Sequence, residues 1–507
     1  MIKILDNEQI RAADKATLGK EGIDSHTLME RAAGRCAGWI LEHIQEGIAF
    51  LVVCGHGNNG GDGLAIARML WQKGKAVRVA LIDNTGTPGV DFSKNLRLWE
   101  ETTGQKAPRA SSHQDIPAPE PDEIIIDAIF GSGLNRKPEG IAADTIKSLN
   151  NTTNRILAVD IPSGLYADRD TEHRELVIRA FATLSFQAPR PAFFYPEYAE
   201  FIGEWEILDI GLDSAFIQAA PAYGFVTEAV DIGQFLPQRP LFGHKGTFGH
   251  ALIAAGSYGK AGAAILAAEA CLRSGTGLVT VRTPASCVTP LQTSVPEAMV
   301  SADSDEQYLT ENLKSGTSFT ALGIGPGIGV GHQTGNVLKR ILQDFDAPMV
   351  IDADALNLLA ENPTWLAFMP AGTILTPHPG EFARLAGKIH NPFDRTSKQV
   401  ELARRFNCYI ILKGKFSAIA CPDGQLFFNP TGNHGMAKGG SGDILTGLIT
   451  GLLAQGIGPM KAALAGTYLH GLAGDLAAMQ IQPAAMTSGD LIDYFSMAFN
   501  EVAASRQ

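Results

Sequence analysis

Apolar and polar positions alternate along the chain in a pattern that predicts strands and helices in turn. Short apolar runs typical of buried strands occur in the first half at 49–54, 76–82, 123–130 and 155–161. The segments between them are helical or loop-like, and two amphipathic helices are expected ahead of them, at 6–18 and 25–44. Strands that alternate with helices form parallel sheets, so the pattern indicates an α/β fold.

The second half restarts this alternation after a stretch in which it fades. Shorter β segments close the first half, at 182–189, 192–196 and 203–212. Periodicity then weakens and prolines recur. Further strands are predicted at 250–256, 277–283, 319–325, 348–354, 372–378, 408–414, 417–421 and 426–430. Helices are predicted at 261–275, 381–387, 397–406, 442–456 and 459–480. We therefore predict two α/β domains, 1–215 and 236–507, joined by a linker at 216–235.

Composition narrows the class of protein. At 507 residues the chain exceeds what one core usually supports, and 45% hydrophobic with 19% charged residues is typical of globular domains. The net charge of −12 argues against nucleic acid as a general partner. The six cysteines form no C-x-x-C pair, so neither a disulfide framework nor a zinc site is suggested. With no apolar stretch of about 18 residues, we expect a soluble cytoplasmic protein without a membrane partner.

A glycine-rich turn, GHGNNGGDG at 55–63, follows the first apolar run. Its beginning fits G-x-G-x-x-G, and Asp83 follows about 20 residues later, as in the fingerprint of dinucleotide-binding Rossmann dehydrogenases. Asn58, Asn59 and Asp62 crowd this turn, however, and a carboxylate beside a phosphate would be repulsive. Amide and carboxylate oxygens suit a cation or sugar hydroxyls better. The alternative is that Asp62 only caps the following helix.

Two later loops carry related chemistry. IIIDAIFGSGLNRK places Asp127 near a strand end, and ILAVDIPSGL places Asp160 at the end of the next strand. In a parallel sheet the carboxyl ends of the strands line one crevice, so Asn59, Asp127 and Asp160 can converge there. One such aspartate is usually a turn residue or a cap, but polar residues at three successive strand ends favour a functional site.

Together, GNNGGDG, DAIFGSGL and VDIPSGL resemble the NAD(P)H-hydrate epimerase domain, over roughly residues 1–215. The resemblance implies a Rossmann-like three-layer αβα fold, with a potassium ion bound by Asn59, Asp127 and Ser163. It also implies that Asp160 is catalytic and lies at the damaged nicotinamide ring. Substrate contact is implied for Asn58, Asn59, Gly60, Gly61 and Asp62 in the first loop and, around the phosphates, for Gly131, Ser132, Gly133, Leu134, Asn135, Arg136 and Lys137 in the second.

The most distinctive string lies near the C-terminus and reads GMAKGGSGDILTG. Its GGSG segment, 439–442, runs directly into an apolar helix, where backbone N–H groups and the helix dipole would stabilise an anion. Asp443 follows in the first helical turn and could accept the proton of an attacking hydroxyl, as phosphoryl transfer requires. The simpler interpretation is that Asp443 is an ordinary acid at a helix N-terminus. The sequence contains no Walker A motif.

Other predicted strands of the second half end in the loops GIGPGIG, TPHPGE and LKGKFS. We expect these loops to line the same crevice as the GGSG segment. The last of these, Lys413 to Ser417, suits a nucleotide phosphate or ribose. His378 in TPHPGE, taken alone, is more typical of a hydrogen-bonded turn residue, and Glu381 could cap the next helix.

These motifs, with HKGTFGHALIAAGS, GAAILAAEACLRSGTG and DADALN, resemble the ADP-dependent NAD(P)H-hydrate dehydratase family, over roughly residues 236–503. The resemblance implies a ribokinase-like αβα fold. It implies that Ala263, Gly327, His378 and Asp443 border the hydrated nucleotide and that Asp443 is catalytic. ADP, assisted by Mg²⁺, is implied at Lys413, Gly414, Lys415, Phe416, Ser417, Gly439, Gly440, Ser441 and Gly442.

Both resemblances concern one metabolite, NADH or NADPH with water added across a ring double bond. We therefore expect interconversion of the R and S forms of NADHX and NADPHX in the first domain. In the second we expect ADP-dependent dehydration of the S form to NAD(P)H, with release of AMP and phosphate. These small molecules, and a second copy of the chain in a homo-oligomer, are the expected partners. Two alternatives stay open: a ribokinase-type small-molecule kinase for the second half and a non-catalytic nucleotide-binding module for the first.

Overall fold

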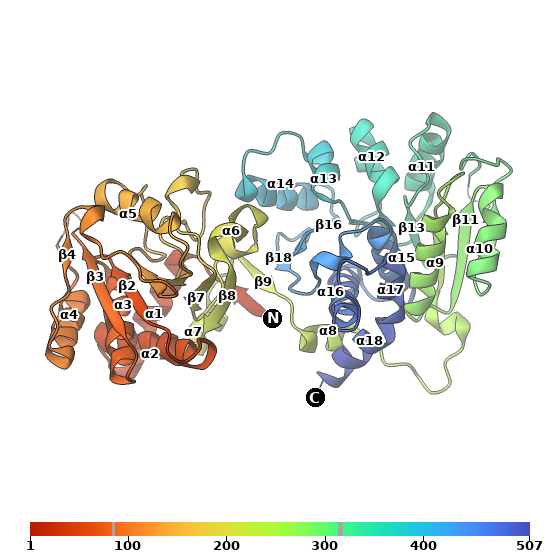
Figure 1. Ribbon diagram of the computed structural model, residues 1–507. Helices are drawn as coiled ribbons and strands as arrows, with labels where there is room; N and C mark the ends of the chain where they lie inside the picture. Colours follow the sequence, from red (N-terminus) through yellow and green to blue (C-terminus); the bar gives the residue numbers. More distant parts are fainter. Residues whose placement is uncertain (84–86, 313–317, 507) are drawn as a thin grey trace. The chain divides into compact units, whose positions relative to one another are not determined.

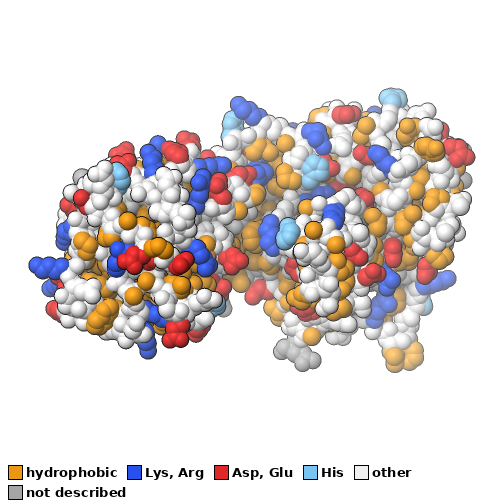
Figure 2. Space-filling model, in the orientation of Figure 1, with side chains coloured by type: hydrophobic (Ala, Val, Ile, Leu, Met, Phe, Trp, Pro, Cys, Tyr) orange, Lys and Arg blue, Asp and Glu red, His pale blue; other side chains and the backbone are white. Residues whose placement is uncertain are grey.

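The computed structural model describes residues 1–83, 87–312 and 318–506. The chain forms two compact units, drawn from red to yellow and from green to blue in Figure 1. One unit comprises Lys3–Tyr223, and the other comprises Gly224–Gln507 together with Met1–Ile2. On the face shown in Figure 2, acidic and basic side chains are interspersed over both units. No helix in the described ranges is both long enough and apolar enough to cross a membrane.

The segment 216–235, expected to be a linker, contains regular structure. It holds the end of helix α7 (Ser214–Ala219), strand β9 (Gly224–Val226) and helix α8 (Ala229–Phe235). Strand β9 pairs in parallel with β18 (Leu426–Phe428), and Ile232 of α8 is fully buried in the core of the C-terminal unit. The sequence periodicity fades here because these elements are too short to display it.

The N-terminal unit is built on a seven-stranded sheet in which every neighbouring pair is parallel. In spatial order the strands are β4 (Arg109–Ala110), β3 (Val77–Ile82), β2 (Phe50–Cys54), β5 (Ile124–Ala128), β6 (Ile156–Val159), β7 (Ala182–Phe186) and β8 (Glu204–Leu208). The predicted strands of the first half are confirmed, except the one at 192–196. That prediction is wrong because Pro191, which fixes φ and lacks an N–H, starts a 3₁₀ helix, η3 (Pro191–Phe194).

Helices cover both faces of this sheet because its central strands carry apolar side chains on both sides. In β2, Phe50, Val52 and Cys54 join one buried cluster, whereas Leu51 and Val53 join another. The first cluster includes residues of α1 (Asn7–Glu21), α2 (Ser25–His43), α3 (Asn58–Gln72) and α4 (Val90–Thr103); the second includes residues of α5 (Gly140–Asn150). The expected three-layer αβα arrangement is therefore present (Figure 1). Shorter elements are β1 (Ile2–Ile4), η1 (His113–Asp115), η2 (Arg174–Leu176), η4 (Pro196–Tyr198) and α6 (Ala199–Ile202).

The C-terminal unit is built on a larger sheet with the order β1-β9-β18-β17-β16-β15-β14-β13-β10-β11-β12. Its strands are β10 (His250–Ala254), β11 (Leu278–Thr283), β12 (Met299–Ala302), β13 (Ala321–Ile324), β14 (Met349–Ile351), β15 (Ile374–Leu375), β16 (Tyr409–Leu412) and β17 (Ala418–Ala420), besides those already named. The strands from β12 to β16 are parallel, and β16, β17 and β18 form antiparallel pairs.

Helices again supply most of the core of this unit. Its helices are η5 (Lys245–Phe248), α9 (Ala261–Arg273), η6 (Ala285–Cys287), α10 (Val288–Ser294), α11 (His332–Asp344), α12 (Ala353–Glu361), η7 (Pro363–Phe368), α13 (Pro379–Ala386), α14 (Pro392–Arg405), η8 (His434–Met436), α15 (Ser441–Ala454), α16 (Pro459–Ala478), α17 (Ser488–Asp493) and α18 (Phe495–Ala504). Helix α15 packs closely on α9, since a Cβ at Gly447 would lie 2.1 Å from the Ala267 carbonyl oxygen. The predicted helices of this half are confirmed.

Each sheet has one point at which the strand order reverses. In the N-terminal unit the chain runs outward from β2 to β3 and β4, then returns to place β5 on the other side of β2. In the C-terminal unit the same reversal separates β10 from β13. Ligands of open α/β sheets bind outside the carboxyl ends of the strands at such points. The glycine-rich segments 55–63 and 325–329 follow β2 and β13, whereas the GGSG segment at 439–442 leads into α15.

Candidate active sites

The N-terminal unit contains a cavity of about 890 Å³ whose wall is formed partly by the turns that follow β2, β5 and β6. Most residues of the two predicted substrate loops line it: Asn58, Asn59, Asp62, Gly131, Ser132, Gly133, Leu134, Asn135, Arg136 and Lys137, joined by Asp160. Gly60 and Gly61 are buried and do not line it. A Cβ at Gly60 would lie 1.8 Å from the Gly55 carbonyl oxygen, so this glycine is needed to fold the turn.

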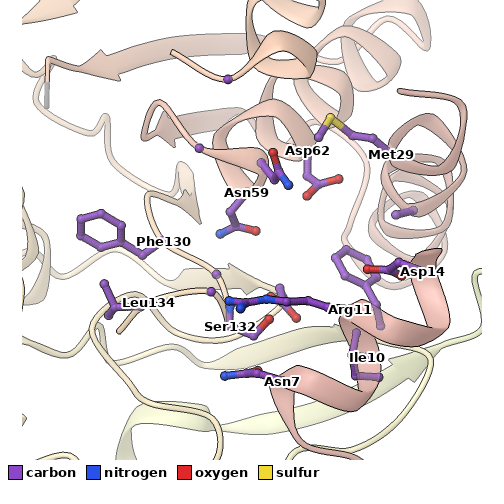
Figure 3. Close-up of a pocket in the computed structure, with 18 of the residues that line it drawn as sticks. Asn7, Ile10, Arg11, Asp14, Met29, Asn59, Asp62, Phe130, Ser132 and Leu134 are labelled. Carbon is purple, nitrogen blue, oxygen red and sulfur yellow. The ribbon is translucent and has the colours of Figure 1, made fainter. Parts of the chain in front are cut away.

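Asn59 lies at the cavity wall with its amide group unpaired. The residue is only 6% exposed, and neither its Oδ1 nor its Nδ2 has a hydrogen-bond partner in the described part of the chain. A buried amide without a partner costs free energy of about 1–3 kcal/mol. Because no described group pairs with it, the amide is available to a ligand. Figure 3 shows Asn59 beside Asp62, above the Ser132 loop.

Asp127 and Ser163, two of the predicted potassium ligands, contact one another directly beneath the cavity wall. The Asp127 carboxylate accepts hydrogen bonds from the Ser163 hydroxyl at 2.6 Å and from its backbone N–H at 2.8 Å. Burial raises the pKa of Asp127 to about 6, although these hydrogen bonds oppose the rise. Asn59 reaches the same loop, because a Cβ at Gly131 would lie 3.3 Å from the Asn59 Cγ, while the Phe130 N–H donates to the Ser163 hydroxyl. The three predicted ligands thus border one loop.

Asp160 is fixed in place by its surroundings. Its backbone adopts a left-handed conformation with φ 67°, which costs a non-glycine residue of order 1–3 kcal/mol and is common at functional sites. The carboxylate accepts a hydrogen bond from the Ser132 N–H at 2.7 Å and one from the Arg190 guanidinium at 3.1 Å. Arg190 is 1% exposed and lines the same cavity, yet it belongs to none of the sequence motifs.

Helix α1 also contributes cavity residues that the motifs do not contain. Its inward side consists of Asn7, Ile10, Arg11, Asp14, Lys15 and Leu18. These positions follow the spacing of one helix face, and polar residues on a predicted inward face are the signal that could have revealed them. Figure 3 shows Arg11 and Asp14 entering the cavity from this helix.

The C-terminal site centres on Asp443 in the first turn of α15. Burial and the nearby carboxylate of Asp352 raise the pKa of Asp443 to about 7, and Lys413 opposes this rise. Lys413 forms an ion pair of 2.8 Å with Asp352, which also accepts a hydrogen bond of 2.8 Å from the Thr446 hydroxyl. A Cβ at Gly442 would lie 3.2 Å from the Lys413 Nζ. The predicted residues Asp443, Lys413 and Gly442 therefore lie together, with Asp352 as a partner that sequence reasoning missed.

Backbone geometry shapes the glycine loop ahead of α15. Gly440 has φ +98°, and a Cβ there would lie 2.6 Å from the Leu266 Cδ1. The Gly439 carbonyl accepts a hydrogen bond from the Ser488 hydroxyl, and the Ser441 hydroxyl lies 3.3 Å from the Nε2 of His470. Burial lowers the pKa of His470 to about 4, so this histidine is neutral at physiological pH. Because the loop directly precedes α15, its backbone lies at the positive end of the helix dipole.

The remaining predicted residues lie on neighbouring loops. The Cβ of Ala263 would lie 3.0 Å from a Cβ at Gly327. His378 is the N-cap of α13: its Nδ1 accepts hydrogen bonds from the Gly380 and Glu381 N–H groups. This confirms His378 as a hydrogen-bonded turn residue and Glu381 as its capping partner.

The predicted nucleotide segment forms a turn after β16. The Ser417 hydroxyl accepts a hydrogen bond from the Gly414 N–H, Lys415 donates to the Gly432 carbonyl at 2.5 Å, and the Lys415 Nζ lies 5.6 Å from the centre of the Phe416 ring. The segment starts at Lys413 and therefore adjoins Asp352 and Gly442. Asp352 could have been found from DADALN, which places an acid directly after an apolar strand.

Comparison with known proteins assigns both units. Residues 251–496 match the family of the NAD(P)H-hydrate dehydratase, and residues 25–192 match that of the YjeF-related protein N-terminus. The bifunctional NAD(P)H-hydrate repair enzyme Nnr of Moorella thermoacetica is 38% identical, covering 95% of this chain and 93% of that protein. The Nnr of Coxiella burnetii is 34% identical, covering 99% and 100%.

Among solved structures, the ADP/ATP-dependent NAD(P)H-hydrate dehydratase of Bacillus subtilis, co-crystallised with ATP and Mg²⁺, is 32% identical. The match covers 55% of this chain and 99% of that chain, with a TM-score of 0.48. The two Nnr relatives, in contrast, match almost the whole length of both proteins. The chain belongs to the family of bifunctional NAD(P)H-hydrate repair enzymes.

Proposed function

We propose that the N-terminal unit interconverts the R and S hydrates of NADH and NADPH, and that the C-terminal unit dehydrates the S hydrate at the expense of ADP. Membership of the family identifies hydrated NAD(P)H as the substrate. The observation that carries the chemistry is the Asp443 carboxyl, which lies beside Lys413 at the start of α15, directly after the glycine loop. Such an arrangement suits transfer of a phosphoryl group to a hydroxyl.

In the N-terminal unit, the cavity of about 890 Å³ is large enough for a dinucleotide. The loop Gly131–Lys137 would contact the phosphates, with Arg136 and Lys137 supplying positive charge. Asp160, held by Arg190 and Ser132, would act at the hydrated ring. Asn58, Asn59 and Asp62, from the turn after β2, would contact the rest of the substrate beside this loop.

A potassium ion in this unit would be held by Asn59, Asp127 and Ser163. The donor set fits, because it offers an unpaired amide oxygen, one carboxylate and one hydroxyl, all of them hard oxygen ligands. No cluster of three His, Cys, Asp or Glu side chains that could hold a metal occurs among the described residues. The ion would supply a fixed positive charge beside the substrate loops.

In the C-terminal unit, Asp443 would take the proton of the ring hydroxyl as its oxygen attacks the terminal phosphoryl group of ADP, so that AMP leaves. The backbone N–H groups of 439–442 would stabilise the developing phosphate charge. The phosphorylated oxygen then leaves as phosphate, and loss of a ring proton restores the double bond of NAD(P)H. Ala263, Gly327 and His378 would border this substrate, and Lys413–Ser417 would contact ADP.

Mg²⁺ at this site would neutralise phosphate charge. Proteins bind Mg²⁺ largely through the substrate phosphates and one or two carboxylates. Asp352 is buried and already engaged by Lys413 and Thr446, at 2.8 Å each. Most ligands of Mg²⁺ would therefore come from the phosphates of ADP, with Asp443 as the carboxyl group beside them.

The dehydratase proposal is tested by giving the purified chain the S hydrate of NADPH with Mg²⁺ and ADP. We expect one NADPH, one AMP and one phosphate for each hydrate consumed. A stable phosphorylated product without NADPH would instead identify a small-molecule kinase. We propose the cytoplasm as the compartment, because all six cysteines are free and buried, as in reducing surroundings. Assembly into a homo-oligomer stays a prediction.

A further inference from the structure

Helix α1 brings a carboxyl group into the N-terminal cavity that no sequence motif contains. Asp14 lines the cavity and is partly exposed, and Figure 3 shows it entering from α1, across from Asn59 and Asp62 of α3. It forms no hydrogen bond or ion pair within the ranges 1–83, 87–312 and 318–506. A carboxyl group held at a cavity wall without a partner is available to a ligand.

The surroundings of Asp14 and Asp160 differ in a way that separates their roles. Asp160 pairs with the buried guanidinium of Arg190 through one oxygen and accepts a hydrogen bond from the Ser132 N–H through the other, so both of its oxygens are engaged. Asp14 lacks such partners. Burial and the charge of Asp160 raise the pKa of Asp14 to about 6, and only Arg190 opposes this rise. Two carboxyl groups in one site whose environments differ in this way form an acid–base pair.

Other charged groups near Asp14 do not offer a better acid. Asp62 of α3 is 9% exposed, and burial together with neighbouring carboxylates raises its pKa well above the usual range. Asp14 is the more exposed of the two, and it enters the cavity from α1, across from α3. Arg11 and Lys15, also on α1, line the cavity one turn or less from Asp14 and carry fixed positive charge.

We propose that Asp14 is the second acid–base group of the epimerase site and acts with Asp160 on the hydroxyl-bearing carbon of the nicotinamide ring. This deepens the proposed epimerase function and rests on it. Water adds to an enamine at the carbon bonded to nitrogen, so the hydroxyl of the hydrate is on that carbon. Loss and renewed addition of water at this carbon invert its configuration.

The step balances with water as the only co-reactant. Asp14 gives its proton to the ring hydroxyl, the carbon–oxygen bond breaks, and the lone pair of the ring nitrogen forms a double bond to the same carbon as water leaves. A water molecule then adds to the other face of this carbon, returns the electron pair to nitrogen, and gives a proton to the carboxylate of Asp160. The reverse reaction uses the two groups in exchanged roles.

The test measures epimerisation of the pure S hydrate of NADPH in H₂¹⁸O, without ADP so that no dehydration occurs. General acid catalysis contributes typically 10²–10⁴-fold, so Asp14→Asn should slow epimerisation by at least about 100-fold. Each inversion in the wild-type protein should place ¹⁸O in the ring hydroxyl. The matched control is Glu8→Gln, which removes an exposed carboxyl from the same helix outside the cavity and should leave the rate unchanged.

The outcomes separate this proposal from the proposed function. If the wild-type chain does not accelerate epimerisation at all, the epimerase function fails. If it does, but the rate of Asp14→Asn stays within about twofold of the wild-type rate, or if inversion occurs without ¹⁸O, the role of Asp14 is overturned.

The pH profile and Asp14→Glu guard against a folding defect. The wild-type rate should fall above the pKa of Asp14, and this fall should disappear in Asp14→Asn. Asp14→Glu should recover part of the wild-type rate. A pH profile in Asp14→Asn that still shows the fall would contradict the proposal.

Discussion

Both sites gather residues that directly follow parallel strands, yet the two are assembled differently. In the C-terminal unit the glycine loop, the helix N-terminus and the Asp443 carboxyl are contiguous over 439–443. In the N-terminal unit the groups come from α1, from the turns after β2, β5 and β6, and from the segment after β7. A site of the first kind is set mainly by local backbone geometry. A site of the second kind exists only once the whole sheet and α1 have packed.

The electrostatics of the two central carboxyl groups differ as well. Asp160 pairs directly with the guanidinium of Arg190. For Asp443, the neighbouring cation Lys413 is engaged by Asp352, and burial raises the pKa of Asp443 to about 7. Asp160 is therefore held in a direct ion pair, whereas Asp443 can gain or lose a proton near physiological pH.

Removing one carboxylate at a time should separate the two reactions. Asp443→Asn should lower dehydration of the S hydrate by roughly 10³-fold, because the group that takes the hydroxyl proton is lost. Epimerisation should be unchanged. Asp160→Asn should show the opposite pattern, with epimerisation reduced by about 100-fold or more. Separate assays of both reactions on both variants check this, and loss of both activities in either variant would contradict two independent sites.

The pH dependence of the dehydratase reports the protonation of Asp443. Asp443 must be ionised to accept a proton, and burial raises its pKa to about 7. The value of kcat should therefore fall about tenfold for each pH unit below 7. Because Lys413 lowers this pKa, Lys413→Met should move the acidic limb to higher pH. A limb at the same pH in wild-type protein and variant would show that another group controls it.

The role of backbone geometry in the glycine loop is tested by Gly440→Ala. The new Cβ would meet the Leu266 Cδ1 at 2.6 Å, in a conformation with φ +98°. We expect a loss of about 1–2 kcal/mol in the free energy of unfolding of the C-terminal unit, and roughly tenfold slower dehydration. Gly458→Ala is the matched control, since φ is −58° and no heavy atom lies within 4 Å. Equal behaviour of the two variants in denaturant unfolding and in the assay would contradict this role.

The smallest effect is expected for Thr446→Val, which removes a hydrogen bond of 2.8 Å to the Asp352 carboxylate. Asp352 is 1% exposed and would keep only its ion pair with Lys413. Unfolding free energy should fall by about 1–2 kcal/mol, with dehydration slowed only a few-fold. Thr450→Val, whose hydroxyl donates to the Thr446 carbonyl within the same helix, serves as control. A control that loses as much as the test variant would refute a specific role for the Asp352 contact.

The sequence was sufficient to predict some of the strands and site residues but not others. Strands such as β2 and β5 were recognisable because their residues are buried on both faces and form continuous apolar runs. Asp443 and the glycine loop were recognisable because their chemistry lies in one short string. The strand predicted at 192–196 failed because proline geometry outweighed apolar composition.

Residues that act through distant contacts could not be found in this way. Arg190 reaches Asp160 across 30 positions, and Asp352 reaches Lys413 across 61. Asp14 lies on a helix whose pattern is explained equally well by packing. Only the folded structure shows which face of α1 borders the cavity.

Two independent sites that act in succession on one metabolite should together recover NADPH from its pure R hydrate. The measurement gives the intact chain this hydrate with K⁺, Mg²⁺ and ADP and records the absorbance of NADPH. Recovery faster than spontaneous epimerisation, abolished by Asp443→Asn and slowed to the spontaneous rate by Asp160→Asn, is the predicted result. Recovery from the S hydrate alone, with the R hydrate turning over only at its spontaneous rate, would contradict the account.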